Sequence, residues 1–131
     1  MTPKSSNLGI SAEDWRALLG ARPNILLVGT ESDTSRLVQS LLPSLQPPVV
    51  WCSSRQFAVP TDETGTLVLQ HAADLSLTAQ DTLLQWIQQS THPRPQIVTT
   101  TSVSLLPRVD QGLFRDALYY RLNVMCIFVG V

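Results

Sequence analysis

Five short runs of apolar and β-branched residues constrain the fold of this chain more than any other feature. The runs cover residues 24–29, 49–52, 66–70, 96–101 and 125–129. Because they are continuous rather than alternating in character, they are typical of strands that are buried on both faces. Strands of this kind occur in parallel sheets, where helices cover both sides.

The stretches between these runs carry apolar residues at helical spacing. We expect helices over residues 11–20, 78–89 and 111–122, and a further one after the polar turn at residues 30–35. The helix at 111–122 is expected to turn the following side chains inward: Leu113, Phe114, Ala117, Leu118 and Tyr120. Strands that alternate with helices predict an α/β fold, with one domain over residues 1–131 in which residues 1–10 are disordered.

Composition excludes several functional classes. The chain has 131 residues and a formal net charge of −1, so it lacks the cationic field that non-specific nucleic-acid binding requires. Its apolar runs are shorter than the ~20 residues of a membrane helix, and its start lacks the apolar stretch of a signal peptide. Cys52 and Cys126 lie in apolar runs without metal-binding spacing, and we expect both to be buried, reduced thiols. A cytoplasmic protein with no metal site and no bound cofactor is expected.

The second half of the chain carries more specific patterns. Residues 65–75 read GTLVLQHAADL, and residues 112–124 read GLFRDALYYRLNV. These segments resemble GTLFLDEIGEL and GxFRxDLYYRLNV of the sigma-54-dependent transcriptional activators, which are AAA+ ATPases. Residues 80–89 are similar to the LLRVLQE helix of that family, and residues 97–102 to its strand that ends in a sensor Asn. The resemblance implies a P-loop core with strand order 5-1-4-3-2.

The resemblance also implies a phosphate-binding loop, from which this chain departs. Such a loop needs glycines, whose bare backbone N–H groups cradle phosphate, and a Lys that reaches the β and γ oxygens. In this chain Asp33 and Ser35 stand where the family has glycines, and Arg36 stands in place of the Lys. We interpret the following residues as a degenerate nucleotide-binding loop: Gly29, Glu31, Ser32, Asp33, Thr34, Ser35 and Arg36.

The Walker B position is altered as well. The family ends this strand in Asp-Glu, which holds magnesium and polarises the attacking water. Here the residues are Gln70 and His71, which lack the anionic oxygens that magnesium prefers. The sensor Asn is replaced by Thr or Ser within residues 99–102. We therefore expect no catalytic residues and no ATPase activity, and we interpret His71 as a structural histidine.

Two arginines of the family pattern are retained. By resemblance, Arg115 and Arg121 occupy positions that reach across a subunit interface to the nucleotide of a neighbour. The alternative is local: Arg115 pairs with Asp116 or Asp110, and Arg121 covers an apolar surface with the stem of its side chain.

Between its second and third strands the family inserts a long segment with the GAFTGA loop that grips sigma-54. Here Ser54 and Gly65 are separated by few residues, so that loop is absent. The chain also stops after the fifth run, before the lid helices and the helix-turn-helix of the family. We expect a non-catalytic regulatory or interaction module that binds a protein partner or itself, without direct DNA binding.

Two alternatives remain open at this point. In the first, Arg36 substitutes for the Lys, and the chain binds ATP or ADP and acts in trans on an AAA+ partner. In the second, residues 25–38 resemble the ILLVDDEPDTRRLL opening of response-regulator receiver domains. A receiver has strand order 2-1-3-4-5, and here its acidic pair is Gly29-Thr30 and its phosphoacceptor is Gln70, so it is unable to accept phosphate.

Overall fold

A parallel five-stranded sheet forms the centre of the computed structural model, which describes residues 16–17, 20–89 and 94–130. The strands are β1 (Ile25–Val28), β2 (Val49–Ser53), β3 (Thr66–Gln70), β4 (Gln96–Thr101) and β5 (Met125–Phe128). Their order in the sheet is β2-β3-β4-β1-β5, and every pair is parallel. The predicted α/β fold and its order 5-1-4-3-2 are therefore confirmed.

The same order rules out the receiver-like alternative. In a receiver, the first strand lies between the second and third strands. Here β1 lies between β4 and β5, with Ile25 opposite both Val98 and Met125, and β2 lies at the sheet edge.

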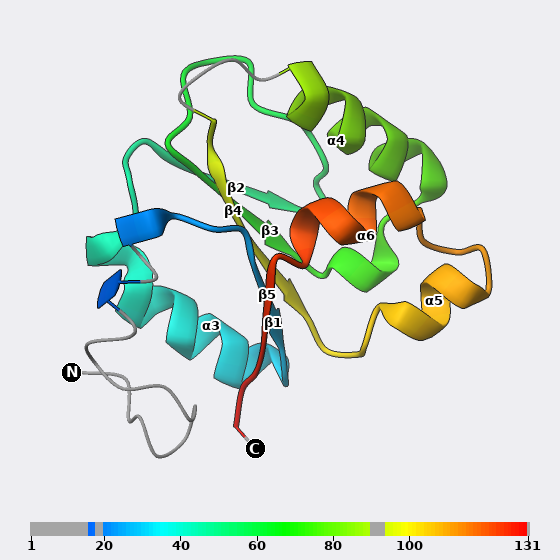
Figure 1. Cartoon of the computed structure of the whole chain (residues 1–131), viewed down its shortest axis with the longest axis horizontal. Coiled ribbons are helices and arrows are strands. Elements are labelled where there is room, and N and C mark those ends of the chain that lie inside the picture. The colour runs from blue at the N-terminus through cyan, green and yellow to red at the C-terminus, as the bar shows by residue number, and fades with distance from the viewer. Residues whose placement is uncertain (1–15, 18–19, 90–93, 131) are drawn as a thin grey trace.

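Helices cover both faces of the sheet (Figure 1), with α3 on one side and α4, α5 and α6 on the other. Their bounds are α3 (Glu31–Leu41), α4 (Leu77–Gln89), α5 (Leu106–Asp110) and α6 (Asp116–Leu122), with short 3₁₀ turns η1 (Leu42–Ser44) and η2 (Ala72–Asp74). Residues 16–17 and 20–21 are helical, while most of the predicted helix at 11–20 and all of residues 1–10 lie outside the described residues.

The predicted helix over 111–122 is wrong at its start. The chain first forms α5, and the amides of Leu113 and Phe114 then both donate to the carbonyl of Arg108, which ends that helix. Gly112 has φ +75°, a left-handed conformation that glycine adopts at little cost. Because α6 begins only at Asp116, the helical phase shifts, and only two of the five side chains expected to point inward are buried. Phe114 and Leu118 are buried, but Leu113, Ala117 and Tyr120 are exposed.

The strands bury both faces in two separate clusters. In β1, Ile25 and Leu27 pack on the α3 side, and Leu26 packs on the side of α4 and α6. This alternation follows from the two-residue period of a strand, and each fully buried side chain contributes about 1.5–3 kcal/mol. The continuous apolar character of β1 is thus explained by helices on both sides of it.

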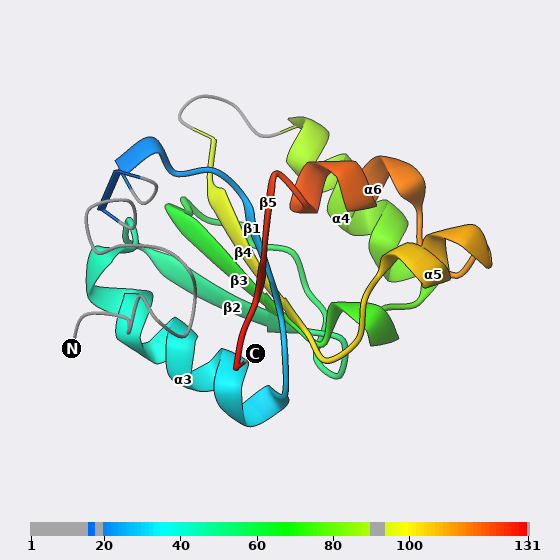
Figure 2. The ribbon, with the colours of Figure 1, turned by 60° about the horizontal axis from the view of Figure 1, so that its bottom comes forward.

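The two cysteines differ, contrary to prediction. Cys52 is buried on β2, and burial raises the pKa of its thiol, although a backbone hydrogen bond from Ala58 opposes this. Cys126 is exposed because β5 is an edge strand of the sheet (Figure 2). Along β5, Cys126 and Phe128 are exposed, while Ile127 between them is buried toward α3. Partial burial still raises the pKa of the Cys126 thiol.

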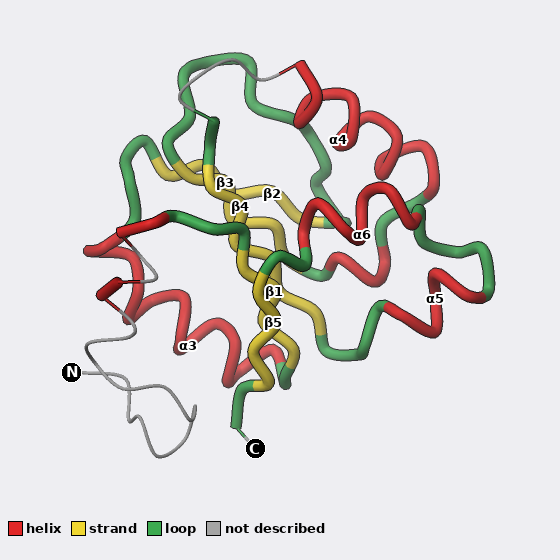
Figure 3. The backbone as a smooth tube through the Cα atoms, in the orientation of Figure 1, coloured by secondary structure: helices red, strands yellow, loops and turns green. Residues whose placement is uncertain are grey.

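A loop without helix joins β2 to β3 over residues 54–65 (Figure 3). Phe57 and Val59 of this loop pack against the cluster on the α4 side. Within the described residues, no helix combines the length and apolar character needed to cross a membrane.

Candidate functional site

The predicted nucleotide-site residues meet at the carboxyl edge of the sheet, where β1, β3 and β4 end. They surround a cavity of only about 10 Å³. Its lining residues are Gly29, Glu31, Thr34, Ser35, Gln70, His71, Thr100, Thr101 and Ser102. The structure thus brings four of the loop positions together with the altered Walker B pair, but Ser32, Asp33 and Arg36 do not line this cavity.

The segment expected to be a loop is a helix. Thr30 is the N-cap of α3, since its Oγ1 accepts from the Asp33 amide at 3.1 Å. The Thr34 amide donates to the Thr30 carbonyl at 2.9 Å, and only Gly29 and Thr30 separate β1 from α3. Glu31 and Asp33 lie in its first turn, where their carboxylates complement the positive end of the helix dipole.

Asp33 and Arg36 lie on α3 beside the cavity without lining it. Gly130, at the end of β5, lies against the Asp33 carboxylate. Arg36 is exposed, and its Nη2 is 3.5 Å from the hydroxyl of Ser32, one turn earlier on α3. The Lys-like position of the resemblance therefore faces solvent along the helix.

His71 closes the cavity from the β3 side. Its Nε2 lies 3.4 Å from Oε1 of Glu31, on the opposite wall. His71 has φ +57°, a conformation that is uncommon for a residue with a side chain. Across the described part of the chain, no group of three or more His, Cys, Asp and Glu side chains is placed to hold a metal ion.

The residues predicted for the sensor separate into two groups. Thr100, Thr101 and Ser102 line the cavity, and the Thr101 hydroxyl donates to the carbonyl of Val103 at 2.8 Å. Thr99 does not line the cavity, and its buried hydroxyl has no hydrogen-bond partner among the described residues.

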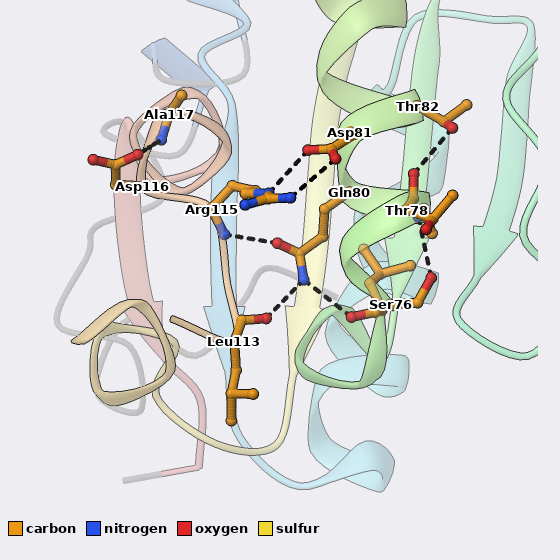
Figure 4. Close-up of polar contacts among 11 residues, drawn as sticks. Ser76, Thr78, Gln80, Asp81, Thr82, Leu113, Arg115, Asp116 and Ala117 are labelled. Carbon is orange, nitrogen blue, oxygen red and sulfur yellow. Dashed lines mark hydrogen bonds and ion pairs between the residues drawn. The ribbon is translucent and has the colours of Figure 1, made fainter. Parts of the chain in front are cut away.

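Arg115 does not line this cavity; its side chain binds Asp81 of α4 instead (Figure 4). Its Nε is 2.9 Å from Oδ1 of Asp81, and its Nη2 is 3.1 Å from Oδ2, a two-point ion pair. The predicted partners Asp116 and Asp110 are both wrong. Asp116 instead accepts from the amide of Ala117, the next residue of α6, at 2.7 Å.

Gln80 supports this pair and was missed in the sequence. It is fully buried, and its Oε1 accepts from the Arg115 amide at 2.7 Å. Its Nε2 donates to the carbonyls of Leu75 and Leu113 at 3.0 and 2.9 Å. A signal was present, since Gln80 precedes Leu83 by three residues and therefore lies on the apolar face of α4.

Arg121 lies at the other end of α6 and lines a different cavity, of about 220 Å³, at the amino edge of the sheet. Its carbonyl accepts from Nδ2 of Asn24 at 2.8 Å. Ile87 and Ile97 line the same cavity, while the predicted covering of an apolar surface by the Arg121 stem stays a prediction.

Comparison with known proteins places this architecture in a family. The model of the sigma-54 interaction domain matches residues 20–130. The DNA-binding transcriptional regulator NtrC of Rhizobium meliloti (strain 1021) is 38% identical over 73 residues, which are 48% of this chain and 15% of NtrC. The nitrogen fixation protein AnfA of Azotobacter vinelandii is 37% identical over 75 residues, which are 50% of this chain and 14% of AnfA. The chain thus spans about one seventh of the length of these relatives.

Solved structures share the fold at low sequence identity. NtrX from Brucella abortus, in complex with ADP, aligns with a TM-score of 0.69 at 15% identity over 90% of this chain and 36% of NtrX. The P-loop NTPase domain of a sigma-54 transport activator from E. coli aligns with a TM-score of 0.61 at 19% identity, over 89% of this chain and 92% of that domain. By its strand order and by the match over residues 20–130, this chain belongs to the sigma-54 interaction domain family.

Proposed function

We propose that this chain is a non-catalytic member of the sigma-54 interaction family, acting in the cytoplasm as a regulatory protein-interaction module. The observation that carries the proposal is the start of α3 only two residues after β1, with Glu31 and His71 on the walls of the small cavity beside it. The absence of nucleotide chemistry is supported at the phosphate position and at the magnesium position, and the interaction role is supported by exposed apolar side chains.

Phosphate binding at the carboxyl edge is opposed by both hydrogen bonding and charge. The Asp33 and Thr34 amides, which a phosphate would need, already donate to Thr30. Glu31 and Asp33 add negative charge where a polyphosphate would sit. A cavity of about 10 Å³ holds roughly one water molecule, far less than a phosphate.

Magnesium chemistry is opposed by the residues at the end of β3. Gln70 and His71 occupy the place of the Walker B carboxylates, and His71 is engaged with Glu31. Magnesium prefers carboxylate oxygens in an octahedral arrangement, which this pair does not offer.

Exposed apolar side chains near the C-terminal end of the chain support a protein partner. Tyr120 on α6, Val124 in the α6–β5 connection and Phe128 on β5 are 69%, 63% and 57% exposed. Large exposed apolar side chains are available for contact with another protein. A second copy of this chain and an intact AAA+ activator are the partners to examine.

Calorimetric titration with ATP and ADP in the presence of magnesium tests the first half of the proposal. We expect no saturable binding up to millimolar nucleotide. The matched positive control restores the family residues with Asp33→Gly, Ser35→Gly, Arg36→Lys, Gln70→Asp and His71→Glu, and this variant is expected to gain binding. Micromolar ATP binding by the unaltered chain that Arg36→Ala removes would contradict the proposal and favour a nucleotide sensor.

Light scattering and co-purification with an intact sigma-54 activator test the second half. We expect either a self-associated species or a complex, weakened by Val124→Asp. Val103→Asp is the matched control, because Val103 is also exposed but lies in the β4–α5 connection. A strict monomer that binds no activator would show that the interaction role is wrong.

A further inference from the structure

The amino edge of the sheet holds a second cavity, of whose lining the family resemblance concerns Arg121 and the proposed function uses none. Its volume is about 220 Å³, and it lies between α4, the end of α6 and the segments that lead into β1 and β4. We call it the arginine pocket, because its lining includes Arg22, Arg94 and Arg121, together with Asn24, Trp86 and Ile97.

The charge of the arginine pocket is one-sided. Three of the nine Lys and Arg residues of the chain line it, whereas no acidic residue lines it among the residues that the structure describes. Among the described residues, carboxylates form ion pairs only with His71 and Arg115, so the three guanidinium groups have no carboxylate within 4.0 Å. Since the whole chain carries a net charge of −1, this positive charge is a local feature.

The backbone around the arginine pocket is held by side-chain hydrogen bonds. Asn24 donates from Nδ2 to the Arg121 carbonyl and accepts at Oδ1 from the Ile97 amide, both at 2.8 Å. Gln96 donates from Nε2 to the Pro23 carbonyl at 2.7 Å. These bonds join the three segments that carry the arginines, so the guanidinium groups start from fixed backbone positions. Such preorganisation lowers the entropy cost of binding.

Arg22 has a second unusual property. Its φ is +53°, in the left-handed region that a long side chain seldom adopts. Residues in such conformations persist where the surrounding structure imposes them, and they gather at ligand-binding positions. Here the constraint comes from Pro23 and Asn24, which are bonded to β4 and α6.

We propose that the arginine pocket binds a small phosphate-bearing anion, of which inorganic pyrophosphate is the simplest representative. Arginine forms two-point hydrogen bonds with phosphate oxygens through its planar fork, and several arginines together match a group with several negative charges. The volume is below the roughly 300–1,000 Å³ of sites for drug-sized ligands, which favours a compact anion. Trp86 and Ile97 provide an apolar wall against which a small organic part can rest.

Calorimetric titration of the whole chain with sodium pyrophosphate tests this proposal. We expect saturable binding that weakens as salt is raised, because the arginines are exposed to solvent. Arg22→Ala, Arg94→Ala and Arg121→Ala should each weaken binding about tenfold, while Arg121→Lys should retain part of it. Arg55→Ala is the matched control, since Arg55 is an exposed arginine outside the pocket, and it should bind like the unaltered chain.

Two results would overturn the proposal. One is the absence of saturable pyrophosphate binding at millimolar concentration, with the variants shown to be folded by circular dichroism. The other is binding that Arg55→Ala weakens as much as Arg121→Ala does. A hexaglutamate peptide provides a further arm: if it binds through Arg121 while pyrophosphate does not, the pocket takes protein carboxylates, and the phosphate assignment is wrong.

Discussion

The two edges of one sheet differ sharply in charge and space. At the carboxyl edge, Glu31 and His71 line a cavity of about 10 Å³. The positive end of the α3 helix dipole there is complemented by the carboxylates of Glu31 and Asp33. At the amino edge, a cavity of about 220 Å³ is lined by three arginines that have no carboxylate partner among the described residues. In open α/β sheets, ligands usually bind at the carboxyl edge. The fold thus provides both edges, but the side chains decide which one has room and charge for an anion.

The difference follows from which side chains form hydrogen bonds with the backbone N–H and C=O groups at each edge. At the carboxyl edge, Thr30 uses its hydroxyl and carbonyl to start α3, so the amides there are already occupied. At the amino edge, Asn24 and Gln96 satisfy the backbone with neutral amides, which leaves the arginines for other contacts. Each of the following predictions disturbs one edge or the connection between them.

The largest effect is expected from Leu27→Asp, which disturbs both edges at once. Leu27 is fully buried in β1, the strand that joins Asn24 at one edge to Gly29 at the other. An unpaired carboxylate there costs more than about 4 kcal/mol, a large part of the stability of a domain. We expect no folded protein in the soluble fraction, measured by expression and circular dichroism.

Leu113→Asp is the control for that prediction. The chemical change is identical, but Leu113 is 51% exposed in the turn before α6. This variant should fold normally. If Leu27→Asp folded as well as Leu113→Asp, the central position of β1 would be wrong.

Gln80→Leu should loosen the packing of α4 against the start of α6. The substitution keeps the apolar volume but leaves the Arg115 amide and the carbonyls of Leu75 and Leu113 without their partner. Each unpaired buried group costs about 1–3 kcal/mol, so we expect a loss of about 2–4 kcal/mol in the free energy of unfolding. Urea denaturation measures it.

The control for Gln80→Leu is Gln88→Leu, on an exposed position of the same helix. It should change stability by less than about 0.5 kcal/mol. Because α4 and α6 both border the arginine pocket, Gln80→Leu should also weaken pyrophosphate binding. An equal effect of the two substitutions would show that Gln80 does not join these helices.

Thr30→Ala acts on the carboxyl edge alone. It removes the side chain that caps α3, which typically costs about 1 kcal/mol. Thr30→Ser should restore most of the loss, because serine also accepts the Asp33 amide. Pyrophosphate binding should be unchanged in both variants, since Thr30 does not line the arginine pocket. Unchanged stability in Thr30→Ala would mean that the segment is not a capped helix.

The sequence predicted the sheet better than it predicted the sites. The apolar runs define the strands, because the sequence pattern records burial, and the family resemblance, strongest over residues 65–127, implied their order. The start of α3 was missed, because the polar residues 30–35 fit a turn and a helical first turn equally well. The arginine pocket was also missed, since Arg22, Arg94 and Arg121 come together only through the folded chain.

The smallest effect concerns Arg115 and Asp81, which connect α6 to α4. The pair has good two-point geometry, but its side chains are 46% and 56% exposed, so water and salt screen much of the attraction. A double-mutant cycle with Arg115→Ala and Asp81→Ala should therefore give a coupling free energy of about 0.2–1 kcal/mol, which falls as salt is raised. Pyrophosphate binding should remain in Arg115→Ala but weaken in Arg121→Ala, although the two arginines are six residues apart. Equal losses in both would mean that the two arginines act on one site, and the contrast between the ends of α6 would be wrong.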